Sequence, residues 1–262
     1  MTILSQILAS KQKDVAQAMR QIPQAEMERR AAARRGIRAF VGAMNKPGIR
    51  ILAEIKRASP SKGDIHPDVA PADQAHAYEQ GGAAALSVLT ETHWFKGSVE
   101  DLIQARQATA LPVLRKDFIF HPYQVYETVV MGADALLLIV RMLSDETLSS
   151  LFRLARKMGL AALVEVHTME DAERISDLAP SLVGINNRNL ENFHTDTTHA
   201  GRLASLLSAS SAVVAASGIS SVEDIRRAAP LRRFLVGEAL MRAPDPAALL
   251  RTWTALPGGA DE

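Results

Sequence analysis

Eight short apolar runs, separated by stretches of helical periodicity, constrain this chain more than any other feature of its sequence. The runs are Ile51–Ile55, Ala84–Leu89, Pro112–Leu114, Ala135–Val140, Ala161–Val166, Leu182–Ile185, Ala212–Ala215 and Phe234–Val236. Helical patterns follow them at 69–80, 98–108, 122–131, 144–158, 168–178, 197–208, 220–229 and 246–255. Runs this short and apolar are typical of strands buried on both faces of a parallel sheet. Eight strand–helix units predict an α/β fold, a (β/α)8 TIM barrel; a doubly wound sheet ranks second because it rarely needs eight such even units.

Residues 1–48, ahead of the first apolar run, predict an N-terminal helical extension. Ile3, Leu4 and Ile7 recur at helical spacing, and Pro23 separates two helical pieces. No Ser/Gly-rich linker divides the rest of the chain. We therefore expect residues 1–262 to form a single barrel domain that includes this extension.

The composition is that of an ordinary soluble globular protein. Of 262 residues 47% are apolar, and the net charge is +1, which calls for neither nucleic acid nor membrane. An arginine cluster at positions 29, 30, 34 and 35 is interpreted as a solvated helix face, because Glu26 and Glu28 lie beside it. The absence of cysteine excludes disulfides and thiol nucleophiles, and it fits a cytoplasmic protein. No apolar run reaches transmembrane length, and Lys11, Lys13 and Asp14 interrupt any signal-peptide core.

Charged and polar residues stand at the ends of the predicted strands, where a barrel carries its catalytic groups. Glu54 and Lys56 are two residues apart at the end of the first strand and so share a face. Lys116 follows the third strand, Glu165 lies in the fifth and Asn186 follows the sixth. Singly, each could be a salt bridge, a surface lysine, a helix cap or a turn residue. Together they predict an acid/base site in which close charges displace one another's pKa values.

Two glycines, Gly218 and Gly237, follow the seventh and eighth strands, and each precedes a helical start. Glycine lets the backbone approach a ligand, and free N–H groups at helix starts bind anions. Two turn glycines are the plain alternative, but the loops after these strands are the usual phosphate site of the fold. Glu238 could offer an anion only its N–H, so we expect its side chain to point away. The seven histidines lack metal-ligand spacing, and no nucleotide-binding fingerprint is present, so neither metal nor cofactor is predicted.

In order and placement, six motifs closely resemble the indole-3-glycerol phosphate synthase family of tryptophan biosynthesis: AEIKRASPSKG, LTETHWFKGS, VLRKDFIF, LVEVHT, GINNRNL and VGEALMR. The likeness covers nearly the whole chain, including the opening helix. It implies a carboxy-lyase that converts 1-(2-carboxyphenylamino)-1-deoxyribulose 5-phosphate into indole-3-glycerol phosphate, carbon dioxide and water without metal or organic cofactor. We expect a monomer that takes this small phosphosugar–anthranilate substrate and makes at most transient contact with other tryptophan-pathway enzymes.

The resemblance also implies roles for single residues. Lys116 matches the lysine that protonates the substrate ketone, and Glu165 matches a carboxylate that stabilises the cationic intermediate. Lys56 and Glu54 match a second acid/base pair; which lysine acts in which step stays open. The other matches hold the substrate: Asn186 and Ser59 as polar contacts, Arg188 as a charged neighbour, Phe95 and Phe118 along the anthranilate ring, Ser217, and Gly218, Gly237 and Glu238 in the phosphate loops.

One position departs from the family pattern. The family usually reads Glu-Ser-Gly-Ile after the seventh strand, and here Ala216 replaces the glutamate. A methyl group stands where relatives carry a pocket-facing carboxylate, so a weaker activity is expected. Two alternatives stay open. Another phosphosugar barrel, such as a ribulose-phosphate isomerase, would need Asp or Cys at the strand ends. A catalytically weakened barrel that acts as a partner subunit has Ala216 as its only support.

Overall fold

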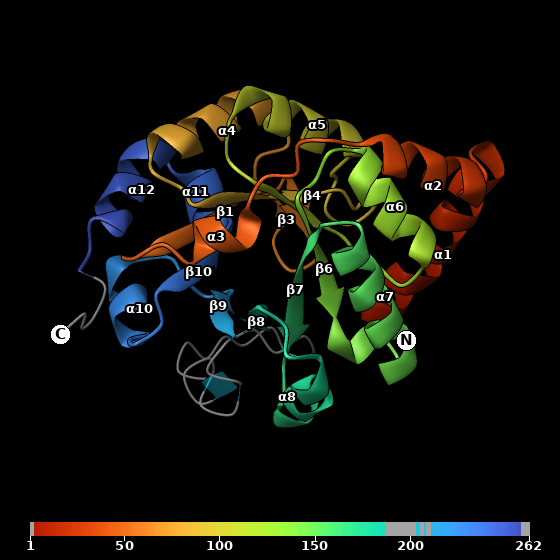
Figure 1. Cartoon of the computed structure of the whole chain (residues 1–262). Helices are drawn as coiled ribbons and strands as arrows, with labels where there is room; N and C mark the ends of the chain where they lie inside the picture. The colour runs from red at the N-terminus through yellow and green to blue at the C-terminus, as the bar shows by residue number, and fades with distance from the viewer. Residues whose placement is uncertain (1–2, 187–202, 205–206, 208–210, 258–262) are drawn as a thin grey trace.

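Eight parallel strands close into a barrel in the computed structural model of the chain, which describes residues 3–186, 203–204, 207 and 211–257. Around the barrel the strands follow the order β1-β10-β9-β8-β7-β6-β5-β4 (Figure 1). They are β1 (Arg50–Ile55), β4 (Ala85–Leu89), β5 (Val113–Lys116), β6 (Ala135–Ile139), β7 (Ala161–Val166), β8 (Leu182–Asn186), β9 (Ala212–Ala216) and β10 (Arg233–Val236). A small antiparallel hairpin, β2 (Ala58–Ser59) and β3 (Gly63–Asp64), follows β1. The predicted TIM barrel is confirmed.

Helices surround the barrel, and the N-terminal extension lies against one side of it. The extension holds α1 (Ile3–Gln21), α2 (Gln24–Ala33) and α3 (Phe40–Met44), with α1 and α2 beside α6 (Figure 1). The others are α4 (Pro71–Gln80), α5 (Val99–Ala108), α6 (Pro122–Val130), α7 (Asp145–Lys157), α8 (Met169–Arg174), α10 (Val222–Arg227), α11 (Glu238–Arg242) and α12 (Pro246–Thr254), with 3-10 turns η1 (Val140–Met142) and η2 (Ser176–Leu178). Across the described residues, no helix combines the length and the apolar character that crossing a membrane requires.

The structure matches the expected elements with a few differences. The third helix of the extension, the hairpin after β1 and the short helix α11 were not predicted, because pieces of two to five residues carry too little periodicity. The helix expected at 168–178 divides into α8 and η2. Most of the helix expected at 197–208 lies outside the described residues.

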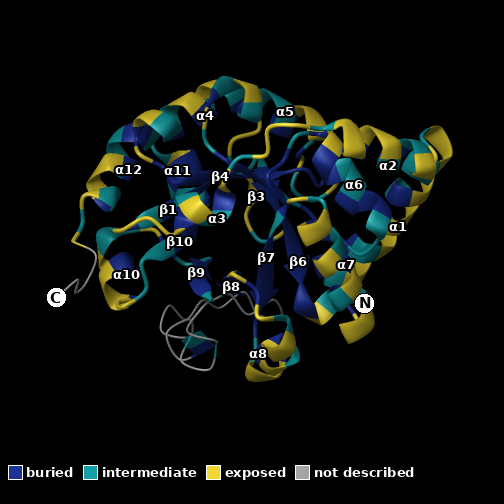
Figure 2. Cartoon of the chain, in the orientation of Figure 1, coloured by how far each residue is buried: buried dark blue, intermediate teal, exposed yellow. Residues whose placement is uncertain are grey.

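Alternation along the strands divides the apolar side chains into two cores. Leu52, Leu114 and Leu163 point into the barrel, where Phe40 and Met44 from α3 cover its N-terminal end. The other core fills the space between strands and helices, so the strands are buried while the exposed residues lie on the outer helices (Figure 2). The alternation that turns Leu52 inward also turns Glu54 and Lys56 inward at the opposite end.

The interpretation of the arginine cluster as a solvated face is wrong for one member. Arg29 and Arg30 are exposed beside Glu26, as expected. Arg34 instead donates to the carbonyls of residues 132 and 133, and its guanidinium lies 3.0 Å from Asp134 Oδ1. Because Asp134 directly precedes β6, this contact ties the extension to the N-terminal end of the barrel.

Candidate functional site

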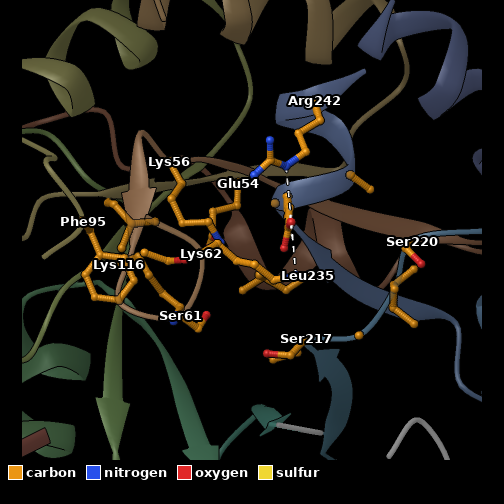
Figure 3. Close-up of a pocket in the computed structure, with 18 of the residues that line it drawn as sticks. Glu54, Lys56, Ser61, Lys62, Phe95, Lys116, Ser217, Ser220, Leu235 and Arg242 are labelled. Carbon is orange, nitrogen blue, oxygen red and sulfur yellow. Dashed lines mark hydrogen bonds and ion pairs between the residues drawn. The ribbon is translucent and has the colours of Figure 1, made fainter. Parts of the chain in front are cut away.

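A cavity of about 890 Å³ opens at the C-terminal ends of the strands (Figure 3). Each of the eight barrel strands lends it at least one residue that lies at or just beyond the strand's end: Glu54 and Lys56, Leu89, Lys116, Ile139, Glu165, Asn186, Ala216, and Leu235 and Gly237. The structure therefore brings together all five residues that the sequence singled out for acid/base chemistry.

The first pair of charges comes from β1 and the residue after it. Lys56 Nζ lies 2.6 Å from Glu54 Oε1, and Glu54 is almost fully buried. Gly237 lies beside this pair, just after β10, the strand that pairs with β1: a Cβ on that glycine would lie 2.5 Å from Glu54 Oε1 and 3.0 Å from Lys56 Nζ. Glycine at 237 therefore makes room for the buried ion pair, in addition to the close approach of a ligand that was predicted for this position.

The second pair joins β5 and β7. Lys116 Nζ lies 3.7 Å from Glu165 Oε2, and Asn186 Nδ2 donates to Glu165 Oε1 at 3.3 Å. Ser217 in turn donates its hydroxyl to Asn186 Oδ1 at 2.8 Å. Burial alone would raise the pKa of Glu165, but Lys116, then His167 and Asn186, outweigh it and lower this pKa. Glu165 is therefore a carboxylate at neutral pH, beside an ammonium group.

His167 is a neighbour of the site that sequence reasoning missed. Its Nε2 lies 3.5 Å from Glu165 Oε1, and the residue is buried and does not line the cavity itself. Burial is the largest influence on this ring and lowers its pKa. The available signal was its spacing, because a residue two positions after Glu165 continues the same face of the chain.

Apolar side chains cover one side of the cavity. The rings of Phe95 and Phe118 lie 6.1 Å apart at 40°, and both line the cavity as the resemblance implies. Ile3, Leu4 and Ile7 from α1 line it too. Their helical spacing was visible in the sequence, but nothing in it indicated that this face of α1 covers the barrel mouth.

The opposite side of the cavity carries the loops after β9 and β10. Gly218 has a φ of 85°, in the left-handed region that favours glycine. The carboxylate of Glu238 lies 3.7 Å from Lys62 Nζ and 3.3 Å from Arg242 Nε, and all three residues line the cavity. Lys62 and Arg242 are labelled in Figure 3. The expectation that Glu238 points away is therefore wrong, because these two cations draw it in. Neither Lys62 nor Arg242 was predicted, although both lie within the quoted motifs.

Ser59, Ala216 and Arg188 are the remaining positions that the sequence singled out. Ser59 is buried and lines the cavity. Ala216 is buried at the end of β9, between Asn186 of β8 and Leu235 of β10 in the strand register. Arg188 lies outside the described residues. In the part of the chain that the structure describes, no group of three His, Asp or Glu side chains could hold a metal ion.

The comparisons with known proteins point to one family. The family model described as "Indole-3-glycerol phosphate synthase" matches residues 4–253. Proteins of that name from Desulfosudis oleivorans and Syntrophobacter fumaroxidans are 49% and 44% identical, over 95% and 94% of this chain and 97% and 95% of theirs.

Solved structures with low sequence identity share the fold alone. N-acetylmannosamine-6-phosphate 2-epimerase from Clostridium perfringens is 15% identical with a TM-score of 0.60, covering 85% of this chain and 98% of its own. Tryptophan synthase subunit alpha from Legionella pneumophila is also 15% identical, with a TM-score of 0.58 over 79% of this chain and 91% of its own.

Proposed function

This chain belongs to the indole-3-glycerol phosphate synthase family, and we propose that the two lysine–carboxylate pairs at its barrel mouth carry out the family's reaction. That reaction closes the ring of 1-(2-carboxyphenylamino)-1-deoxyribulose 5-phosphate and removes carbon dioxide and water, in tryptophan biosynthesis. The observation that supports the proposal is the arrangement of both pairs around one cavity, with the lysine nitrogen and the carboxylate oxygen 2.6 Å apart in one pair and 3.7 Å apart in the other.

We assign the acid role in ring closure to Lys116. The ring carbon that bears the carboxylate attacks the ketone carbon, a carbon–carbon bond forms, and the ketone oxygen takes a proton from the Lys116 ammonium. The adduct carries a positive charge, which the ionised Glu165 stabilises; its Oε2 lies 3.7 Å from Lys116 Nζ. Loss of carbon dioxide then returns an electron pair to the ring and removes this charge.

Dehydration needs an acid and a base in turn. The new hydroxyl group leaves as water after it takes a proton, and loss of a ring proton completes the indole. Lys56 and Glu54 form the second pair with these two capacities, and Lys56 also supplies a positive charge for the substrate carboxylate. The assignment of single steps to the two lysines stays part of the proposal.

Substrate orientation follows from the two sides of the cavity. The anthranilate ring is placed against Phe95 and Phe118, which supply its apolar wall. The phosphate is placed at the opposite side, by the backbone at Gly218 and Gly237, where Lys62 and Arg242 add positive charge. Ser59 and Asn186 hold the polar centre of the substrate, Ser217 orients Asn186, and Glu238 is displaced from its two cations when the phosphate arrives. Arg188 keeps the role that the resemblance implies.

One assay tests the proposal directly. The anilino-deoxyribulose phosphate is added to the purified chain, and indole fluorescence reports the product. Product formation by this chain alone is expected and would contradict the partner-subunit alternative. No turnover at any pH between 6 and 9 would overturn the proposal, and turnover of ribulose 5-phosphate in its place would support the isomerase alternative.

We also propose that the chain works as a monomer, in the cytoplasm, as one domain without a cofactor, and that any contact with other tryptophan-pathway enzymes is transient. Sedimentation of the chain alone and mixed with those enzymes checks this. A stable dimer or a complex that survives dilution would contradict it.

A further inference from the structure

A buried ion pair connects the N-terminal helix to the strand that carries Lys116. Lys11 of α1 is 6% exposed, and its Nζ lies 2.9 Å from Asp117 Oδ1. Lysine is almost never fully buried unless it is paired. We propose that Lys11 is a positioning residue for the reaction: through Asp117 it fixes the turn that presents Lys116 and Phe118 to the cavity. This inference rests on the acid role given to Lys116 above.

Asp117 is the centre of a buried network on the outside of the barrel. Its Oδ2 accepts from Thr90 Oγ1 at 2.7 Å and from Arg115 at 3.0 Å. Arg115 in turn lies 2.7 Å from Glu127 on α6. Burial alone would raise the pKa of Asp117, but Arg115, Lys11 and Thr90 lower it to about 2. The carboxylate is therefore charged throughout the neutral range, and four charges link α1, β5 and α6.

Side-chain alternation at the end of β5 connects this network to the cavity. Side chains alternate, so Arg115 and Asp117 point outward while Lys116, between them, points inward. Asp117 Oδ1 accepts from Lys11 and also from the backbone N–H of Phe118, at 2.9 Å. One oxygen thus holds both the helix and the peptide group directly after Asp117. A displacement of about 1 Å at a catalytic group can lower a rate by ~10²-fold, so the placement of this turn affects turnover.

The contact between Lys11 and Asp117 also fixes the position of α1. Ile3, Leu4 and Ile7 line the cavity, and Lys11 continues their face of the helix one turn further on. A second polar contact of α1, between Asp14 and His93 at 3.3 Å, is exposed and so contributes little. The buried Lys11 pair is therefore the stronger of these two contacts between α1 and the loops of the barrel mouth.

The test compares Lys11→Met with Lys13→Met. Methionine keeps an unbranched apolar side chain and removes the ammonium, and Lys13 is an exposed lysine on the same helix. We expect Lys11→Met to lower kcat ~10-fold, within the range that misplacement of a catalytic group produces, and Lys13→Met to leave it unchanged. Lys11→Arg, which restores a cation, should recover most of the loss. A rise in KM with kcat unchanged would show that Lys11 only seats α1, and would overturn the proposal.

A double-mutant cycle separates positioning from general loss of structure. If Lys11 acts through Lys116, Lys11→Met should have little further effect on kcat once Lys116 is alanine. An equal fold-change in both backgrounds would overturn the proposal. If Lys11→Met does not fold, Lys11→Gln, which keeps a neutral donor for Asp117, is compared in the two backgrounds in its place. Inactivity of the unaltered chain would instead count against the proposed function, so the two failures are distinguishable.

Discussion

Two buried carboxylates at opposite ends of the barrel bind the N-terminal extension by the same chemistry. Asp117 at the C-terminal end forms an ion pair with Lys11. Asp134 at the N-terminal end forms ion pairs with Arg34 of the extension at 3.0 Å and with Arg106 of α5 at 2.5 Å. Asp134 also accepts the backbone N–H groups of residues 38 and 113. Only Asp117 adjoins a residue of the proposed site. In this fold the N-terminal end contributes stability and the C-terminal end carries the chemistry, so equal contacts should have unequal consequences for activity.

At the C-terminal end, Lys116→Ala is expected to have the largest effect on kcat of the substitutions considered. Loss of a general acid lowers kcat about 10²–10⁴-fold, while the melting temperature should change little, because Lys116 lies partly exposed at the cavity. Lys116→Arg should not restore turnover, since a guanidinium does not release its proton near neutral pH. Steady-state kinetics with thermal melts checks both. Turnover near that of the unaltered chain in Lys116→Ala would place the acid elsewhere.

Asp134→Ala is the counterpart at the N-terminal end. It leaves Arg34 and Arg106 without their buried partner, and breaking such a pair typically lowers the free energy of unfolding by roughly 3–5 kcal/mol. The kcat of the folded protein should be unchanged. Urea unfolding and kinetics at low temperature measure the two quantities. Asp145→Ala is the control, because Asp145 makes its ion pair with Arg174 at the surface and should contribute under about 1 kcal/mol. A tenfold loss of kcat in Asp134→Ala would contradict the claim that contacts at the N-terminal end affect stability but not activity.

The sequence predicted the barrel and the inward direction of its acid/base groups because both follow from local periodicity. Glu54, Lys116 and Glu165 needed only strand alternation and the rule that strand ends form one mouth. The two ion pairs that attach the extension to the barrel, Lys11 with Asp117 and Arg34 with Asp134, could not be predicted in the same way. Lys11 and Arg34 pair with residues about a hundred positions away, and no periodicity indicates which distant carboxylate a cation meets. Arg34 was accordingly interpreted as solvated.

Glycine positions give a finer comparison within the barrel interior. Gly237→Ala places a methyl group 2.5 Å from Glu54 Oε1, so the carboxylate must shift relative to Lys56. We expect kcat/KM to fall about tenfold, equivalent to ~1.4 kcal/mol. Gly184→Ala is the matched control: it also lies in a barrel strand, β8, but its Cβ would meet Leu163 at an ordinary 3.5 Å. An equal loss in both variants would mean that interior volume, and not the ion pair, sets the activity.

Ala216→Glu tests whether the missing carboxylate of β9 weakens the catalytic end. A glutamate there would face the same cavity as Lys56 and Lys116 and would attract their charge. We expect kcat/KM to rise ~10-fold, or ~1.4 kcal/mol of transition-state stabilisation, with a small loss of stability because the position is buried. Kinetics from pH 6 to 9 checks this. Equal or slower turnover throughout would mean that the site has adapted to alanine.

The smallest expected effect is the pH dependence that Glu165 imposes. Its pKa is lowered from the ordinary 4.5, so the catalytic carboxylate is present above that value and is lost only as pH falls through the lower, folded-state pKa. At pH 4.5 an unperturbed glutamate would be half protonated, which would halve any activity that needs its charge. We therefore expect less than a twofold loss of kcat/KM between pH 7 and 4.5 from this group, measured with circular dichroism to verify folding. Asn186→Ala removes one of the contacts that lower this pKa and should move the acid limb upward. Asp134→Asn, at the other end of the barrel, should leave that limb in place, and a matching shift in both variants would show that the limb reports acid unfolding instead of Glu165.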